Sequence, residues 1–374
     1  MRQARPLSRG AVTLSAVGDS FPTVRAAAVQ AASVFLDREG STEKACALIR
    51  EAGRNGAQVI AFPEGFVPAH PVWFHFHSAS GRISTQLSVE LFKNAVEVPG
   101  REVEALCAAA RDAAAYVVVG VCEKVPGTLG TMYNSQLFIG PDGTLLGKHQ
   151  KLMPTVGERL VHAGGYGDTF GAVQTDFGPM SGLICGENSN PLAVFALTAE
   201  ATRVHVMSWP NHFPTISDPM RSRIEIDSKA FAQMSKAYVV SAAGAVDERM
   251  VELLELSPAD EEFIRNPALT GGSLIVAPDS RTLAGPLGAE EAILYADLDL
   301  ETSVKMKLRH DFAGHYNRPD VFQMRVNTQR PELYGRVSAG LPEPDPDALH
   351  ETASANYLER VLRAHELPEG NGEH

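Results

Sequence analysis

The sequence has few cysteines, no long hydrophobic run and no excess of positive charge. Its 374 residues include four cysteines, at positions 46, 107, 122 and 185, and none of them stands in a CxxC or other metal-type spacing. This scarcity favours a reducing compartment, so we expect a cytoplasmic protein. The formal net charge of −12 offers no basic surface for nucleic acid. No run approaches the roughly 20 apolar residues of a membrane span, so we expect no membrane contact.

The chain is long enough to bury a large core, as one extended α/β domain or as two. Apolar runs of strand length alternate with helical patterns. We expect strands over residues 24–31, 117–121, 204–209 and 238–243, and helices over residues 41–52, 102–115 and 219–236. Ser41 is the expected N-cap of the first helix, and Asp218 with Pro219 marks the start of the last. The alternation favours one domain over residues 23–330, preceded by a flexible extension over residues 1–22.

Two segments repeat one pattern and indicate internal symmetry. Residues 137–145 and 274–283 are both apolar strands that return through a Pro-Asp turn. Equivalent hairpins would indicate a pseudo-symmetric pair of sheets with helices outside, and chance similarity of two turns is the alternative. From Arg330 the composition shifts to Pro, Glu and Ala, which predicts a tail over residues 331–374 with one short helix over residues 353–364.

Cys185 stands where a buried strand is expected to end. It follows the apolar run 181–184 and precedes a turn and a helical pattern that Asn188 and Pro191 open. The carboxyl end of a buried parallel strand is where α/β proteins place their ligands. A free thiol is only roughly a few per cent thiolate at neutral pH, and a helix N-terminus or a nearby cation increases that fraction. Cys185 is therefore a candidate nucleophile, and a buried core cysteine is the alternative.

Two more polar side chains follow expected strand ends. Glu64 comes after the apolar run 57–62, and Lys151 ends the strand pattern that begins at Leu145. Both residue types are mostly exposed, so a solvated loop acid and a surface lysine are the alternatives when each position is taken singly. Because the carboxyl ends of such strands open onto one crevice, we expect Glu64, Lys151 and Cys185 to meet there.

Taken together, these segments resemble the nitrilase superfamily, and most closely its nitrilase branch. The resemblance runs from about Val24 to Asn327. It rests on Phe62-Pro63-Glu64-Gly65, on Lys151-Leu152-Met153-Pro154-Thr155 with Glu158-Arg159, on Gly182-Leu183-Ile184-Cys185-Gly186-Glu187-Asn188, and on Gly314-His315-Tyr316-Asn317-Arg318-Pro319-Asp320. It implies a four-layer αββα sandwich with a C-terminal extension, and an enzyme that hydrolyses a nitrile to the carboxylic acid and ammonia.

The resemblance also implies a catalytic triad of Glu64, Lys151 and Cys185, with Glu158 at the position of an additional active-site glutamate. In that chemistry Cys185 attacks the substrate carbon, Glu64 moves protons and Lys151 stabilises the tetrahedral species. Glu158 orients Lys151, and a surface acid is the alternative. The route through a thioimidate and a thioester needs no metal or organic cofactor. Many nitrilases carry Trp directly after the nucleophile, whereas Gly186 stands here, so their substrate preferences do not transfer.

Other residues are predicted to build the surroundings of this site. Trp73 and Trp209 are candidate walls of the substrate pocket, and a core or interface anchor is the alternative for each. Asn134 matches a family position near the site and is expected to support it. Glu187 and Asn188 are expected to cap the helix that follows the nucleophile.

A cluster of three histidines invites a metal-binding interpretation, which the pattern does not favour. His70, His75 and His77 follow Glu64 closely, but no carboxylate or cysteine stands beside them at a recognised zinc spacing. We therefore expect no metal site.

The sequence leaves several functions open. The leading hypothesis is a nitrilase with a small-molecule nitrile as substrate, and cyanide is a special case of it. The nearest alternative is an amidase or carbamoylase of the same superfamily, and an inactive binding or scaffold protein is a further one. The resemblance implies a homo-oligomer, a dimer or a larger spiral of dimers, with the tail as a candidate for subunit contacts.

Overall fold

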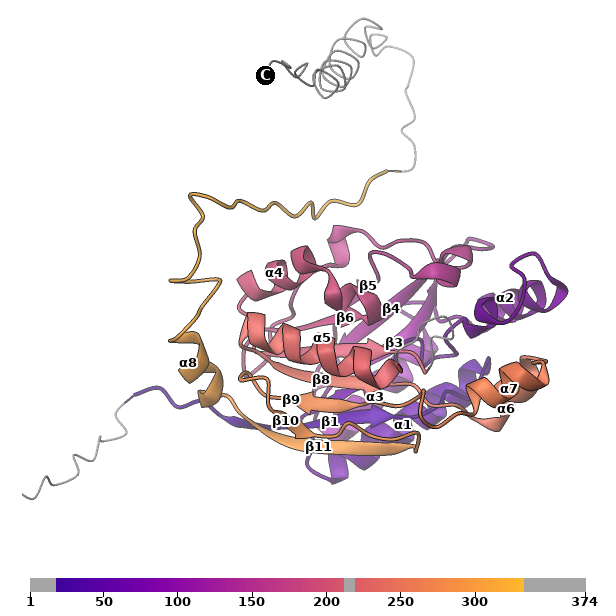
Figure 1. The fold of residues 1–374 in the computed structure, drawn as a ribbon, viewed down its shortest axis with the longest axis horizontal. Helices are drawn as coiled ribbons and strands as arrows, with labels where there is room; N and C mark the ends of the chain where they lie inside the picture. The colour runs from indigo at the N-terminus through magenta and orange to yellow at the C-terminus, as the bar shows by residue number, and fades with distance from the viewer. Residues whose placement is uncertain (1–17, 212–218, 333–374) are drawn as a thin grey trace, which may run out of the picture. The chain divides into compact units, whose positions relative to one another are not determined.

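The computed structural model describes residues 18–211 and 219–332 (Figure 1). The chain divides into two compact units, Met1–Arg330 and Pro331–His374, and only Pro331 and Glu332 of the second unit are among the described residues. Asp218, most of the predicted N-terminal extension and the predicted helix over residues 353–364 lie outside them.

The first sheet has six strands in the order β11-β1-β2-β3-β4-β5. They are β11 (Ala292–Asp299), β1 (Thr23–Gln30), β2 (Val59–Ala61), β3 (Tyr116–Lys124), β4 (Met132–Ile139) and β5 (Leu145–Gln150). The first three strands along the chain are parallel, whereas β4, β5 and β11 run antiparallel to their neighbours. β5 therefore forms one edge of this sheet.

The second sheet repeats this plan with five strands in the order β10-β9-β8-β7-β6. They are β10 (Thr282–Ala284), β9 (Leu274–Val276), β8 (Tyr238–Ala243), β7 (Val204–Trp209) and β6 (Met180–Ile184). Three parallel strands are again followed by an antiparallel hairpin. The hairpins β4-β5 and β9-β10 are the two segments with Pro-Asp turns, so the predicted internal symmetry is present.

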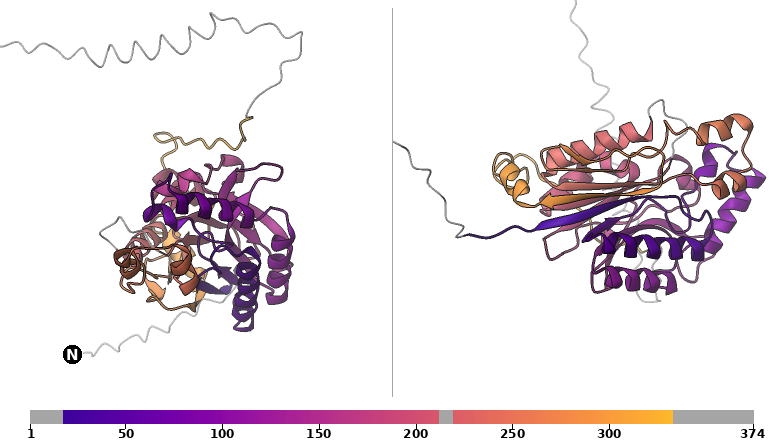
Figure 2. Two further views of the ribbon diagram at one scale, coloured as in Figure 1. Left: turned by 90° about the vertical axis from the view of Figure 1, so that its right-hand side faces the viewer. Right: turned by 90° about the horizontal axis from the view of Figure 1, so that it is seen from below.

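The two sheets stack face to face and carry helices on their outer faces (Figure 2). α1 (Arg38–Arg54) and α3 (Arg101–Ala113) pack on the first sheet through buried residues such as Ile49 and Leu106. α4 (Pro191–Ala199) and α5 (Met220–Ser235) pack on the second through Leu197 and Phe231. Small side chains of β1 and β2 meet β7 and β8 between the sheets. This arrangement confirms the predicted αββα sandwich.

Connections after the carboxyl ends of β1, β2 and β8 gather at one end of the sandwich. They include η1 (Val72–His75), α2 (Arg82–Asn94), α6 (Glu248–Leu253) and α7 (Pro258–Ile264), and Figure 1 shows the three α-helices side by side there. A separate apolar cluster holds this end together. α8 (Glu301–Lys307) follows β11. Among the described residues, no helix is both long and apolar enough to cross a membrane.

The start of α1 differs from the prediction. The helix begins at Arg38, because the Asp37 side chain accepts a hydrogen bond from the Gly40 backbone N–H at 2.9 Å and acts as the N-cap. Ser41 lies in the first turn, where its hydroxyl donates to the Val34 carbonyl at 3.0 Å. Ser41 therefore fixes the preceding loop and does not cap the helix.

Candidate active site

Glu64 lies where the two sheets are joined by hydrogen bonds. It follows β2, and its backbone N–H donates to the carbonyl of Trp209, at the end of β7, over 3.2 Å. Next to it, the Ser208 hydroxyl donates to the carbonyl of Phe62 at 2.8 Å. The Glu64 side chain is fully buried. A carboxylate in that position needs polar partners, since an unpaired buried charge is strongly destabilising.

Lys151 supplies the opposite charge. It follows β5 and is fully buried, and its Nζ donates to Glu64 Oε1 at 2.7 Å and to Glu158 Oε2 at 2.5 Å. Glu158 lies on η2 (Val156–Leu160), where the Thr155 backbone N–H also donates to its Oε2 at 2.8 Å. One ammonium therefore bridges two carboxylates that arrive from different loops.

Asn134 completes this arrangement from β4. Its side-chain N–H group donates to Glu64 Oε1 and to Glu158 Oε1, each at 2.7 Å, and its backbone carbonyl accepts a hydrogen bond from the backbone N–H of Lys151 at 2.8 Å. One residue thus orients all three charged groups. Glu64 Oε2 accepts no hydrogen bond within the described part of the chain, so this oxygen is the one available for a proton.

The two carboxyl groups have different acidities. Burial raises the pKa of Glu64 to about 7, where the charge of Lys151 opposes the shift and that of Glu158 adds to it. Burial acts in the same direction on Glu158, but Lys151, His162 and His70 together outweigh it and hold the Glu158 pKa well below its usual value. Burial by itself lowers the pKa of Lys151, yet Glu64 and Glu158 raise it well above its ordinary range. At neutral pH the ammonium and Glu158 are therefore charged, and Glu64 is poised to exchange a proton.

Cys185 lies at the end of β6, on the second sheet. Its backbone has a φ of 52°, a left-handed conformation that costs a non-glycine residue about 1–3 kcal/mol and is typical of strained functional turns. Burial raises the pKa of its thiol well above the usual value; the charge of Glu64 adds to this shift and that of Lys151 opposes it. The structure thus brings Cys185 into the electrostatic field of the other three predicted residues.

The turn after Cys185 differs from the expected helix start. Cys185–Ser189 forms a short 3-10 helix, and α4 begins only at Pro191, capped by the side chain of Asn190. Asn188 instead donates to the carbonyl of Cys185 at 2.9 Å and fixes the turn. Glu187 accepts the backbone N–H of Ile184 at 3.0 Å, so it caps the short turn and not α4.

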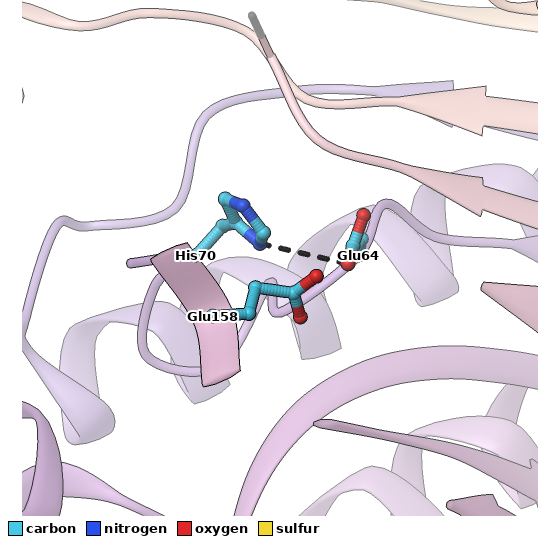
Figure 3. Close-up of side chains that lie close together, drawn as sticks. All are labelled: Glu64, His70 and Glu158. Carbon is cyan, nitrogen blue, oxygen red and sulfur yellow. Dashed lines mark ion pairs between the residues drawn. The ribbon is translucent and has the colours of Figure 1, made fainter. Parts of the chain in front are cut away.

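A histidine and the two glutamates form a further cluster that the sequence pattern did not indicate. His70 comes from the loop before η1, and Figure 3 shows its ring beside Glu64 and Glu158. One atom from each lies within 4.8 Å of the others, a spacing that suits a metal ion. The ammonium of Lys151 already bridges both carboxylates. Burial lowers the pKa of His70 to about 3, so its ring is neutral.

The two tryptophans lie in different parts of the interior. Trp209 is buried in the same apolar cluster as Cys185, and its carbonyl binds Glu64. Trp73 is buried in the cluster under α2, with its ring edge-on to Phe35. The structure therefore brings Trp209 to Glu64 and Cys185 and holds Trp73 in a separate cluster.

Comparison with known proteins shows the family of the chain. The profile of the carbon-nitrogen hydrolase family matches residues 25–307. The chain is 36% identical over 323 residues to "Nitrilase 2" from an unknown prokaryotic organism, which covers 84% of this chain and 96% of that protein. It is 37% identical over 308 residues to an aliphatic nitrilase of Sinorhizobium fredii, covering 82% and 96%.

Solved structures share the fold. The C. elegans NitFhit protein superposes with a TM-score of 0.65 at 17% sequence identity, over 84% of this chain and 70% of that chain. The resemblance inferred from the motifs is thereby confirmed. The chain belongs to the carbon-nitrogen hydrolase family, within its nitrilase branch.

Proposed function

We propose that the protein hydrolyses a nitrile to the carboxylic acid and ammonia, with Cys185 as nucleophile, Glu64 as base and Lys151 as the stabilising cation. The observation that carries this proposal is the buried Glu64–Lys151–Glu158 group facing Cys185. The nitrilase names of the relatives supply the substrate class. The function is thus a hydrolysis that uses only side chains of this chain.

The first step forms a bond between Cys185 Sγ and the nitrile carbon. Because burial disfavours a free thiolate, the thiol proton moves as the bond forms, and Glu64 Oε2 is the acceptor without another partner in the described part of the chain. The C≡N group becomes a C=N group, and Glu64 passes the thiol proton to its nitrogen, which restores the carboxylate for the next step. Lys151, which stays protonated, stabilises the negative charge that develops.

Two waters complete the reaction. The first adds to the C=N carbon of the thioimidate with Glu64 as base, and the tetrahedral species breaks its C–N bond and releases ammonia. The second water attacks the resulting thioester, breaks the C–S bond and returns the proton to the thiol. Should the tetrahedral species expel the thiolate first, the product is an amide. Glu158 has the supporting role of holding Lys151 in place.

We propose that Asn134 and Trp209 lie closest to the bound substrate. Asn134 donates to both carboxylates. Trp209 shares the apolar cluster of Cys185 and offers a flat wall. Trp73 is proposed as a wall further from the nucleophile, through its neighbour Phe74 in the same loop.

Parallel measurement of ammonia from nitriles and from the matching amides tests this function. Aliphatic, aromatic and arylacetonitrile substrates, with cyanide, form the panel, and Cys185→Ala is the blank. We expect faster ammonia release from at least one nitrile than from its amide. Faster turnover of amides would favour the amidase or carbamoylase alternative. No turnover of any member would leave the scaffold alternative.

We further propose a cytoplasmic homo-oligomer. All four cysteines are free thiols, as a reducing compartment requires. Leu192, Val321 and Phe322 are exposed apolar side chains around a groove of about 820 Å³ between α4 and the segment after α8, and a second copy of the chain would cover such a surface. Light scattering at micromolar concentration should give at least a dimer mass, and a monomer would refute the assembly. Deletion of residues 335–374 tests the tail separately, since an unchanged assembly would refute only its role.

A further inference from the structure

The carboxylate of Glu187 accepts three hydrogen bonds in the interior. Its Oε1 accepts the backbone N–H of Leu152 at 2.6 Å, and its Oε2 accepts the backbone N–H of Ile184 at 3.0 Å. His149 Nε2 lies 3.0 Å from Oε2 and donates to it when that nitrogen carries the proton. Hydrogen bonds to an ionised acceptor are roughly twice as strong as neutral ones. Glu187 is therefore held firmly on both oxygens.

These two backbone groups adjoin the predicted cation and nucleophile. Leu152 directly follows Lys151, and Ile184 directly precedes Cys185. β5 and β6 are edge strands of different sheets, so the N–H groups on their open sides have no neighbouring strand to bind. Glu187 accepts the N–H of Ile184, the last residue of β6, and the N–H of Leu152, two residues beyond the end of β5, and so joins the chain at the two strand ends.

We infer that Glu187 is a positioning residue that sets the spacing between Lys151 and Cys185 by tying the backbone that follows β5 to the end of β6. The inference rests on the proposed function, because it concerns the groups that we assign to that reaction. We assign Glu187 no contact with the substrate. Its effect passes through the backbone to the ammonium on one side and to the sulfur on the other.

The spacing matters because Lys151 acts on the reacting atoms by charge and direction. A displacement of about 1 Å between reacting groups can cost about a hundredfold in rate. Glutamine has nearly the shape of glutamate but only one accepting oxygen. In Glu187→Gln the amide N–H₂ group must therefore face the N–H of Leu152 or that of Ile184, and one of the two ties is lost.

Steady-state kinetics with a nitrile provide the first test. For Glu187→Gln we expect kcat to fall about tenfold to a hundredfold with KM changed less than about threefold, because the substrate still binds. Glu123→Gln is the matched control. Glu123 is a buried carboxylate on β3 of the first sheet that accepts hydrogen bonds from the side chains of Ser135 and Gln150. For Glu123→Gln we expect less than about a threefold change in kcat. An equal loss in both variants, or no loss in Glu187→Gln, would overturn the inference.

Alkylation of Cys185 by iodoacetamide separates positioning from general damage. Followed by peptide mass, its rate should fall about tenfold in Glu187→Gln when Lys151 is present. In a Lys151→Met background the same substitution should change the rate less than about twofold, since the cation to be positioned is gone. Equal losses in both backgrounds would show that Glu187 acts on Cys185 alone.

Two further measurements separate a folding defect from a positioning role, and the role of Glu187 from the proposed function. Should Glu187→Gln fail to fold, as judged by its thermal unfolding, His149→Phe removes one donor and keeps both backbone ties. Because the carboxylate is then held less firmly, the substitution should lower kcat by about fivefold, beyond the limit set for the control, and an unchanged kcat would count against the inference. Alkylation needs no nitrile. A wild-type protein that turns over no substrate would therefore refute the proposed function, while the alkylation rates still decide the role of Glu187.

Discussion

The two sheets present different chemistry at their carboxyl ends. The first sheet and its loops carry Glu64, Lys151, Asn134 and Glu158, which bind one another before any substrate arrives. The second sheet carries Cys185, a neutral thiol on a strained turn, with apolar neighbours such as Trp209. The charges are thus assembled on one sheet and the nucleophile on the other.

In the proposed mechanism, this division allows a buried thiol to react although it is not ionised in the free enzyme. A charge on Cys185 is disfavoured by burial and by the nearby carboxylates. The other buried thiol close to the site, Cys122, has its pKa raised by burial in the same way, but its sulfur donates to the Ala69 carbonyl. Cys185 differs from Cys122 because the charge of Lys151 acts on its sulfur and lowers its pKa. Reactivity therefore depends on how the first sheet is aligned with the second.

Removing the nucleophile should have the largest effect. Cys185→Ser should lower kcat/KM by about a thousandfold or more, because a hydroxyl is a far weaker nucleophile than a thiolate at neutral pH. Intact mass during turnover of the wild type should show an acyl or thioimidate adduct that maps to Cys185. Cys107→Ser, at a half-buried thiol on α3, is the control and should retain activity. Full activity in Cys185→Ser, or an adduct on Cys46, Cys107 or Cys122, would refute the mechanism and leave the fold standing.

Removing the base from the first sheet should cost nearly as much. In Glu64→Gln the side chain keeps its shape but loses the oxygen that takes the thiol proton, so we expect a loss of about a thousandfold. The loss should not add to that of Cys185→Ser in the double variant, because residues that act as a unit are non-additive. An additive double variant would mean that the two sheets contribute independently.

The pH profile reports the charge balance within the first sheet. Because Glu64 must be ionised to act as base and its pKa is about 7, kcat/KM for an uncharged nitrile should fall about tenfold per pH unit below that value. In Glu158→Gln one of the charges that raise the Glu64 pKa is gone, and Lys151 pairs with Glu64 alone. The acid limb should then move to lower pH. A limb that stays in place, or moves upward, would contradict this account of the Glu64 pKa.

The sequence predicted the strands well because their apolar runs are buried on both faces. β7 and β8 have the predicted bounds, since such runs end sharply at polar residues or turns. Helix starts are harder to predict, because Asp and Ser are both favoured N-cap residues and the sequence offers Asp37 and Ser41 close together. The fold decides between them through the hydrogen bond from Ser41 to Val34.

The candidate site was predictable only in its separate parts. The positions of Glu64, Lys151 and Cys185 after strand ends indicated three residues in one crevice, but no sequence pattern contains the distance between residues of two sheets. Nor does it contain the distances between loops of one sheet, on which the bridge by Asn134 and the approach of His70 depend. One signal could indicate Glu187, namely an acid three residues after a strand end, and the sequence alone favours a helix cap there. Its second partner, Leu152, follows β5 of the other sheet and is 35 residues away along the chain, so the local pattern does not show it.

Removing metal ions should have the smallest effect, and it tests what supplies the positive charge on the first sheet. The Glu64, His70 and Glu158 side chains are close enough to hold an ion, yet the Lys151 ammonium lies at hydrogen-bond distance from both carboxylates and keeps its proton. Prolonged treatment with a strong chelator should therefore leave the rate unchanged. Added Zn²⁺ would have to compete with that ammonium for the same oxygens, so it should not activate the enzyme. A loss of activity on chelation that zinc restores would show that a metal ion supplies the positive charge. The first sheet would then contribute metal ligands in place of a lysine cation.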